Sequence, residues 1–204
     1  MNLRYPDKPE RSHVTVLTML DDGRHTAQSK LDGWRCMTVI EENSVSFMSR
    51  SLRKLPVNEQ VKAAVKRLVL DGYVQPGTVF DGEWLRRRPG YEGKECLYLF
   101  SPLVLNGQWV GHRRFGERWA WMTSLGLPVD KLTDKLPQHD LLLPAWCETG
   151  LKSFYDRQVG VMRTEGVVVY SNDGQHHGNA SRSLKVHDMV KVKWREGADE
   201  GDRT

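Results

Sequence analysis

Hydrophobic and polar positions along the chain alternate in short runs, interrupted by segments with helical spacing. From Asn58 to about Leu70, apolar side chains recur every three or four residues. This predicts an amphipathic helix with Asn58 as its N-cap and Gly72 as its stop. The same spacing predicts helices over about 111–124 and about 149–161.

Alternating and β-branched runs predict strands between these helices. A polar Glu42-Asn43 turn separates the first two strands, and the turn-rich segments 88–90 and 172–179 are expected to be loops. Helices interspersed with short strands support a mixed α/β architecture. The expected strands cover 34–41, 45–49, 79–85, 97–105, 167–170 and 189–194.

Four short motifs carry residues with distinctive chemistry. The first places a lysine, which can serve as a nucleophile, beside a tight Asp-Gly turn and an arginine. The second and third each pair a glutamate with a glycine, and the fourth sets two lysines on one face of a predicted strand. In chain order, the motifs are Lys30-Leu31-Asp32-Gly33-Trp34-Arg35, Phe80-Asp81-Gly82-Glu83, Glu165-Gly166-Val167-Val168 and Lys191-Val192-Lys193.

This set suits nucleotidyl transfer to a lysine. An amine that attacks the α-phosphate of a nucleoside triphosphate must be neutral, whereas a free lysine has a pKa near ~10.4. Neighbouring cations disfavour the ammonium form, and the candidates are Arg35, Lys191 and Lys193 together with bound Mg²⁺. Glu83 and Glu165 are candidate ligands for Mg²⁺, which shields the triphosphate.

Each motif taken alone also fits an ordinary structural role. The Asp-Gly pairs at 32–33 and 81–82 are hairpin-turn signals, and lysines on strands are usually solvated. The ordered occurrence of all four motifs favours the chemical interpretation over four separate coincidences.

On these motifs, the chain resembles the nucleotidyltransferase (adenylation) domain of ATP-dependent DNA ligases. These enzymes belong to the superfamily of polynucleotide ligases and mRNA capping enzymes that form covalent lysyl-nucleotides. The resemblance runs from about Val14 to Lys193. It implies an α+β, ATP-grasp-like domain, with mostly antiparallel sheets flanked by helices and a central nucleotide cleft. We expect this domain to cover 1–195, followed by an acidic flexible tail over 196–204.

The resemblance also implies a role for each matching residue. Lys30 corresponds to the nucleophile, in a catalytic set completed by Asp32, Arg35, Lys191 and Lys193. The residues expected to bind ATP are Gln28 at the adenine edge, Phe100 stacked on the adenine ring, Lys191 and Lys193 at the α-phosphate, and Lys30, Arg35, Glu83 and Glu165 around them. Glu83 and Glu165 are the expected Mg²⁺ ligands.

A DNA contact is implied by Ser49-Arg50, which matches the ligase element that holds the 5′-phosphate of a nick. Arg50 is therefore the expected DNA-binding residue. Ordinary alternatives are that Arg50 is a solvated loop cation and that Phe100 belongs to the core, although an aromatic ring can serve both core and site.

The chain departs from the ligase pattern at three points. Ser101 follows Phe100 where DNA ligases usually have aspartate, and Tyr170 stands where many have lysine. Ligases normally continue into an OB-fold domain whose basic motif orients pyrophosphate, but this sequence ends at Thr204. We expect no OB-fold domain here, with a protein partner as one way to supply its function.

The resemblance implies an ATP-dependent DNA ligase that seals nicked duplex DNA through lysyl-AMP, with ATP and Mg²⁺ as cofactors. Three alternatives stay open. The chain can be an RNA ligase or RNA-repair nucleotidyltransferase that acts on nicked RNA or a hybrid. It can be a capping-type guanylyltransferase, which GTP would label. It can also be a module that binds nicks or nucleotides without turnover.

Composition is consistent with a nucleic-acid partner. The 204 residues are 39% hydrophobic, enough for one core or for two subdomains that share a cleft. The net charge is +4 and the pI about 9.0, so phosphate contacts would come from local patches. Residues 86–88 and the group Arg113, Arg114 and Arg118 are such patches, with a solvated face as the alternative.

Cysteine and histidine usage excludes two other classes of site. Three widely separated cysteines fit neither a disulfide framework nor a zinc site, which favours a reducing compartment. His176-His177 lacks partners at ligand spacing and is expected to be part of a loop. No run of eighteen apolar residues occurs, so we expect a cytoplasmic protein without a membrane partner.

Overall fold

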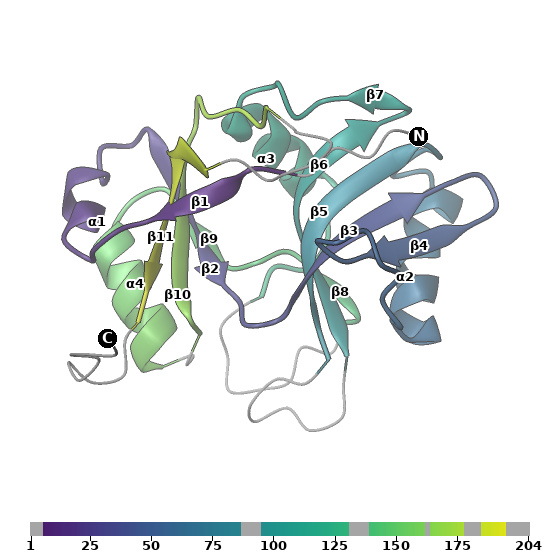
Figure 1. The fold of residues 1–204 in the computed structure, drawn as a ribbon, viewed down its shortest axis with the longest axis horizontal. Coiled ribbons are helices and arrows are strands. Elements are labelled where there is room, and N and C mark those ends of the chain that lie inside the picture. The colour runs from purple at the N-terminus through teal and green to yellow at the C-terminus, as the bar shows by residue number, and fades with distance from the viewer. Residues whose placement is uncertain (1–5, 87–94, 131–138, 162–163, 178–184, 195–204) are drawn as a thin grey trace.

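The computed structural model describes residues 6–86, 95–130, 139–161, 164–177 and 185–194, with the backbone alone at 185–187. Two β-sheets lie side by side, and the helices pack around them (Figure 1). The predicted tail over 196–204 and Arg87 and Arg88 of the first basic patch lie outside the described residues.

The first sheet has the strand order β1-β11-β10-β2-β9. All of its pairings are antiparallel except that of β1 with β11, which is parallel. Helices α1 (Val16–Met19) and α4 (Leu151–Gly160) lie beside this sheet, on the left of Figure 1. Leu17, Ala27, Leu151 and Val167 form the centre of their shared apolar core. The strands are β1 (Lys8–Arg11), β2 (His25–Lys30), β9 (Trp146–Cys147), β10 (Gly166–Ser171) and β11 (Lys185–Lys193).

The second sheet has the order β4-β3-β5-β6-β7, and β8 pairs in parallel with β6. Helix α2 (Glu59–Leu70) packs beside β4, whereas α3 (Phe115–Ser124) contacts β6 and also β10 of the first sheet. The helix α3 therefore bridges the two sheets. The strands are β3 (Trp34–Ile40), β4 (Val45–Met48), β5 (Thr78–Leu85), β6 (Cys96–Leu105), β7 (Gln108–Trp109) and β8 (Leu141–Leu142).

The three predicted helices are present, and the mostly antiparallel α+β fold is confirmed. Asn58 caps α2, because its side chain accepts a hydrogen bond of 2.9 Å from the Val61 amide. Gly72, with φ of +77°, follows the end of that helix. Helix α3 begins at Phe115 rather than near 111, because the backbone of Arg114 is extended, with ψ of 145°. The first two helical amides donate to the carbonyls of Gly174 and Asn172.

Several short elements have no counterpart in the predicted pattern. β1 is the polar tetrapeptide 8–11 and β2 is the largely polar segment 25–30, so neither carries an alternating apolar signal. Their strand conformation depends on neighbours that are distant in sequence. No helix among the described residues is long and apolar enough to span a membrane.

Candidate active site

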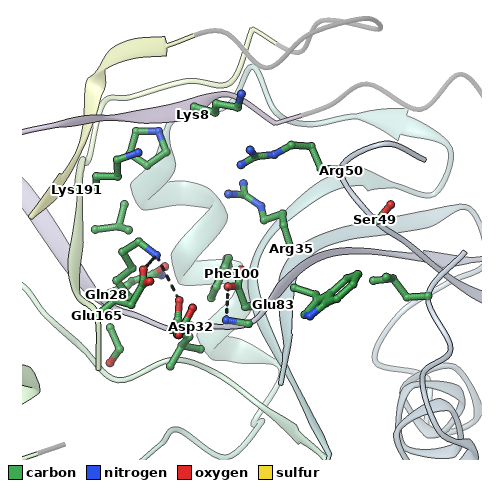
Figure 2. A pocket seen from close by; sticks show the side chains of 18 of the residues that line it. Lys8, Gln28, Asp32, Arg35, Ser49, Arg50, Glu83, Phe100, Glu165 and Lys191 are labelled. Carbon is green, nitrogen blue, oxygen red and sulfur yellow. Dashed lines mark hydrogen bonds and ion pairs between the residues drawn. The ribbon is translucent and has the colours of Figure 1, made fainter. Parts of the chain in front are cut away.

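A pocket of about 1000 Å³ contains every residue that the sequence predicts for the site, although these residues come from both sheets. Figure 2 labels eight of these side chains, Gln28, Asp32, Arg35, Arg50, Glu83, Phe100, Glu165 and Lys191, around one space. Eight lysine or arginine side chains but only three acidic ones are among its described lining residues. This excess of positive charge suits an anionic ligand. The predicted residues are Gln28, Lys30, Asp32, Arg35, Arg50, Glu83, Phe100, Glu165, Lys191 and Lys193.

Lys30 lies at the end of β2 and forms an ion pair with Glu165. The ammonium group of Lys193 lies 3.0 Å from the same Glu165 oxygen, so one carboxylate joins both lysines. Burial opposes the charged form of Glu165, but the hydrogen bonds from Lys30 and Lys193 outweigh it and lower the pKa of Glu165. The nearest charge to the candidate nucleophile is therefore a carboxylate.

Gly166 makes this arrangement possible. It lies on β10 between Lys30 on β2 and Lys193 on β11, and pairs with both. Its φ is +130°, and a Cβ atom there would come within 2.0 Å of the Val192 carbonyl oxygen. Only glycine fits where the three strands approach this closely. The close approach brings Lys30 and Lys193 to Glu165, the residue that precedes Gly166.

Arg35 makes a bidentate ion pair with Asp81, a residue of the second motif. Its charge is therefore already compensated, although the sequence predicts Arg35 as one of the cations that disfavour the ammonium form of Lys30. Neighbouring Glu83 accepts a 3.0 Å hydrogen bond from the Gly33 amide. Burial raises the pKa of Glu83, although Arg35 and Lys30 act in the opposite direction.

Gln28 is 1% exposed, and neither its amide nitrogen nor its amide oxygen has a hydrogen-bond partner among the described residues. A buried amide without partners is costly in a folded protein, and a ligand with a complementary polar edge would satisfy it. Phe100 packs against a small apolar cluster and also lines the pocket. Phe100 therefore belongs to the core and to the pocket wall at once.

Arg50 is exposed in a turn that reaches the pocket from the second sheet. Hydrogen bonds between Ser49 and Arg53, including 2.8 Å from the Ser49 amide to the Arg53 carbonyl, close this turn. Lys191 faces the pocket from β11, on the opposite sheet. Asp32 is exposed at the pocket rim, in the turn between β2 and β3.

The prediction that Arg113, Arg114 and Arg118 form a surface patch is wrong, because the Arg118 side chain is buried, with 3% exposed. The Arg118 side chain donates to the Ser101 hydroxyl and to the Arg113 carbonyl. Its partner at Ser101 is thus neutral, at the position where DNA ligases usually have aspartate. Burial lowers the pKa of Arg118 to about 10.

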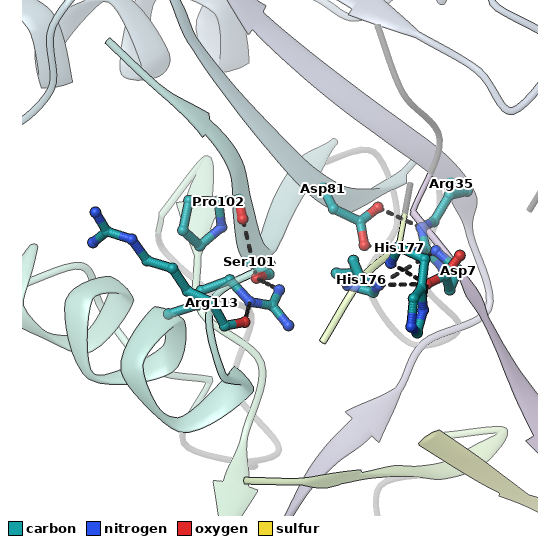
Figure 3. A network of polar contacts seen from close by, with 9 residues as sticks. Asp7, Arg35, Asp81, Ser101, Pro102, Arg113, His176 and His177 are labelled. Carbon is teal, nitrogen blue, oxygen red and sulfur yellow. Dashed lines mark hydrogen bonds and ion pairs between the residues drawn. The ribbon is translucent and has the colours of Figure 1, made fainter. Parts of the chain in front are cut away.

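Three further features of the site region escaped sequence reasoning. Lys8 lines the pocket from β1, which carries no apolar pattern. Tyr170, the second departure from the ligase pattern, stacks on Phe115 with ring centroids 4.2 Å apart. His176 lies in a loop as expected, but it is 3% exposed and contacts the buried Asp7 (Figure 3). No local motif marks such contacts.

The carboxylates can hold Mg²⁺ only together with other ligands. The described residues contain no group of three or more His, Cys, Asp and Glu side chains suited to a metal. Mg²⁺ commonly takes one or two protein carboxylates and completes its shell with water and substrate phosphates. Glu83 and Glu165, which line one pocket, fit this mode of binding.

Comparisons with known proteins connect this fold to ligases. No protein-family model and no curated protein matches the chain. Mycobacterial DNA ligase D complexed with ATP is 18% identical, with a TM-score of 0.64 over 93% of this chain and 60% of that one. The bacteriophage T7 ATP-dependent DNA ligase, also with ATP, is 14% identical, with a TM-score of 0.61 over 92% of this chain and 68% of that one.

An archaeal ATP-dependent RNA ligase is similar as well. It is 14% identical, with a TM-score of 0.57 over 93% of this chain and 48% of that one. The chain thus spans about 60% of the mycobacterial ligase and half of the RNA ligase. The predicted resemblance is confirmed at the level of structure: the chain has the fold of the nucleotidyltransferase domain found in ATP-dependent DNA and RNA ligases.

Proposed function

We propose that this chain is the nucleotidyltransferase domain of an ATP-dependent DNA ligase, which seals nicks through a covalent adenylate on Lys30. The observation that carries the proposal is the position of Lys30, in a basic pocket and in contact with a glutamate that also contacts Lys193. The similar folds of two DNA ligases solved with ATP support it.

The first step joins Lys30 to the nucleotide. The ammonium group loses a proton to solvent, the freed Nζ lone pair forms a bond to the α-phosphorus of ATP, and the bond to pyrophosphate breaks. Nζ then releases a second proton to solvent, which leaves the phosphoramidate. Lys191 and Lys193 stabilise the negative charge on the α-phosphate in the transition state. Mg²⁺, held by Glu83 and Glu165, would neutralise phosphate charge when bound.

The pocket supplies orientation as well as charge. Gln28 offers a free amide to the edge of the base, and Phe100 offers an aromatic face for stacking. Glu165 holds the Lys30 side chain at one place while the fold keeps Glu165 in position through Gly166. Holding the reacting atoms in this way removes much of the entropic cost of the reaction.

Two later steps complete the proposed cycle. An oxygen of the 5′-phosphate attacks the lysyl-AMP phosphorus, the bond to Nζ breaks as Nζ takes up a proton from solvent, and a phosphoanhydride forms. The 3′-hydroxyl then attacks the 5′-phosphate, loses its proton and releases AMP. Arg50 binds the 5′-phosphate in both steps, because it is an exposed cation at the pocket rim without an ion-pair partner in the described structure.

Incubation with α-labelled ATP or GTP and Mg²⁺, followed by denaturing electrophoresis, tests the nucleophile and the nucleotide together. We expect label from ATP on the unmodified chain and none on Lys30→Ala. Lys66→Ala, which changes an exposed lysine of α2, serves as the control and should retain the label. An adduct of equal yield in Lys30→Ala would exclude Lys30 as the nucleophile.

RNA ligation is the second candidate, favoured by the similar fold of the archaeal RNA ligase. Sealing assays on nicked DNA, nicked RNA and DNA–RNA hybrids separate the two. Faster sealing of nicked DNA is expected from the proposal. Activity confined to RNA ends would replace DNA ligase with RNA ligase, and labelling by GTP alone would indicate a guanylyltransferase.

A further inference from the structure

Lys8 is a pocket cation to which no motif assigns a role. It belongs to β1, an edge strand of the first sheet, and it lines the pocket together with Arg35 and Arg50 (Figure 2). Arg35 is neutralised by Asp81, whereas Lys8 and Arg50 have no ion pair within the described part of the chain. Lys8 and Arg50 thus bring two positive charges to one pocket without an ion-pair partner among the described residues.

The backbone on both sides of Lys8 is held in place. The preceding Asp7 is fully buried, and its amide donates to His176 Nδ1 at 3.3 Å while its carboxylate accepts from the His177 amide at 2.7 Å. After Lys8, parallel pairing with β11 sets Arg11 opposite Lys191. Little backbone entropy is therefore lost when a ligand engages Lys8, and only its side chain has to be ordered.

The charge of the pocket selects the class of ligand. Arg50, Arg53 and Lys54 also line it without an ion pair among the described residues, and they lie in the segment that follows β4 of the second sheet. Cations that converge on a concave surface repel one another unless an anion lies between them. A phosphate group is such an anion, and its several oxygens can accept from Lys8 and Arg50 together.

We infer that Lys8 is a phosphate-binding residue of this pocket, which reaches a phosphate of the substrate from β1. The inference rests on the proposed function for the identity of the phosphate-bearing substrate. Two sources share this chemistry, namely the terminal phosphates of the nucleotide and the 5′-phosphate of a nicked strand.

Equilibrium binding to the full chain distinguishes these sources without requiring turnover. Lys8→Met keeps the apolar stem and removes the charge, Lys8→Arg keeps the charge, and Lys66→Met is the matched control on α2. If Lys8 binds the terminal phosphates, Lys8→Met weakens ATP binding about tenfold and leaves AMP binding unchanged. If it binds the nick, the variant loses about tenfold of the preference for a 5′-phosphorylated over an unphosphorylated nick.

Either loss supports the inference if Lys8→Arg restores the binding and Lys66→Met does not reduce it. Unchanged binding in both comparisons would overturn it, as would an equal loss for ATP and AMP together with an unchanged preference at the nick. Thermal unfolding of each variant reports whether the fold is intact. The labelling assay tests the proposed function separately. If that function is wrong, the unmodified chain forms no labelled adduct, but the binding comparisons for Lys8 can still be made.

Discussion

Lys30, at the end of β2, forms an ion pair with Glu165, which directly precedes the neighbouring strand β10. The candidate nucleophile therefore contacts the third motif before any nucleotide binds. The two residues are 135 positions apart in the sequence. Because Lys193 contacts the same carboxylate oxygen, the glutamate separates two like charges that would otherwise repel.

Replacing Glu165 with Gln should slow lysine adenylation and weaken the fold together. The amide keeps the shape but loses the charge that holds Lys30 in place and would hold Mg²⁺, so we expect adduct formation to fall roughly 10²-fold and stability to fall by about 1 kcal/mol. Single-turnover labelling and urea unfolding measure the two effects. Glu42→Gln, in an exposed turn, is the control and should change neither. Wild-type labelling rates in Glu165→Gln would contradict the assigned role.

Gly166→Ala should be among the most disruptive small substitutions in the chain. A Cβ atom at this positive φ meets the Val192 carbonyl, so the strands must separate at the point that holds Glu165. We expect a loss of roughly 2–4 kcal/mol in the free energy of unfolding. Gly160→Ala, where nothing lies within 4 Å, should be neutral or stabilising. Chemical denaturation of both variants decides the matter, and equal stabilities would show that the strand contact is unimportant.

The sequence allowed prediction of the parts of the site that local patterns encode. Lys30, Glu83, Glu165 and Lys193 each lie in a short motif whose turn or strand could be predicted from its own residues. Their convergence in one pocket came from the resemblance to a known fold, because a motif does not state which other motif it meets.

Other parts could not be predicted because they depend on contacts between distant segments. Asp7 and His176 are 169 positions apart, and each looks like an ordinary polar residue in its own segment. The pairing of Arg35 with Asp81 joins two correctly identified motifs, yet no spacing rule indicates that one neutralises the other. The sequence predicts a surface position for Arg118, because a buried arginine without a carboxylate partner is rare, whereas the structure buries it.

His176 should make the fold sensitive to mild acid. Burial lowers the pKa of His176, and its Nδ1 accepts from the Asp7 amide, which requires the neutral ring. The unfolded chain therefore takes up the proton first as the pH falls below ~6.5, and the free energy of unfolding decreases by up to about 1.4 kcal/mol per pH unit.

Denaturant unfolding between pH 7 and pH 5 measures this slope. His176→Asn keeps an acceptor for the Asp7 amide and removes the titrating ring, so the slope should become shallower than in the unmodified chain. His112→Asn, at an exposed position, is the control and should leave the slope unchanged. Identical slopes in the His176 variant and the unmodified chain would assign the acid sensitivity to other groups.

Gln28 should show opposite effects on stability and on ligand binding. Its buried amide lacks partners, so Gln28→Leu removes an unsatisfied polar group and should stabilise the fold by about 1 kcal/mol. The same change removes the only polar contact proposed for the base edge, so ATP binding should weaken and discrimination between ATP and GTP should decrease. Thermal unfolding and competition binding measure these effects, with Gln60→Leu on the exposed face of α2 as the control. A variant that is less stable yet keeps its preference for ATP would show that Gln28 serves the core rather than the ligand.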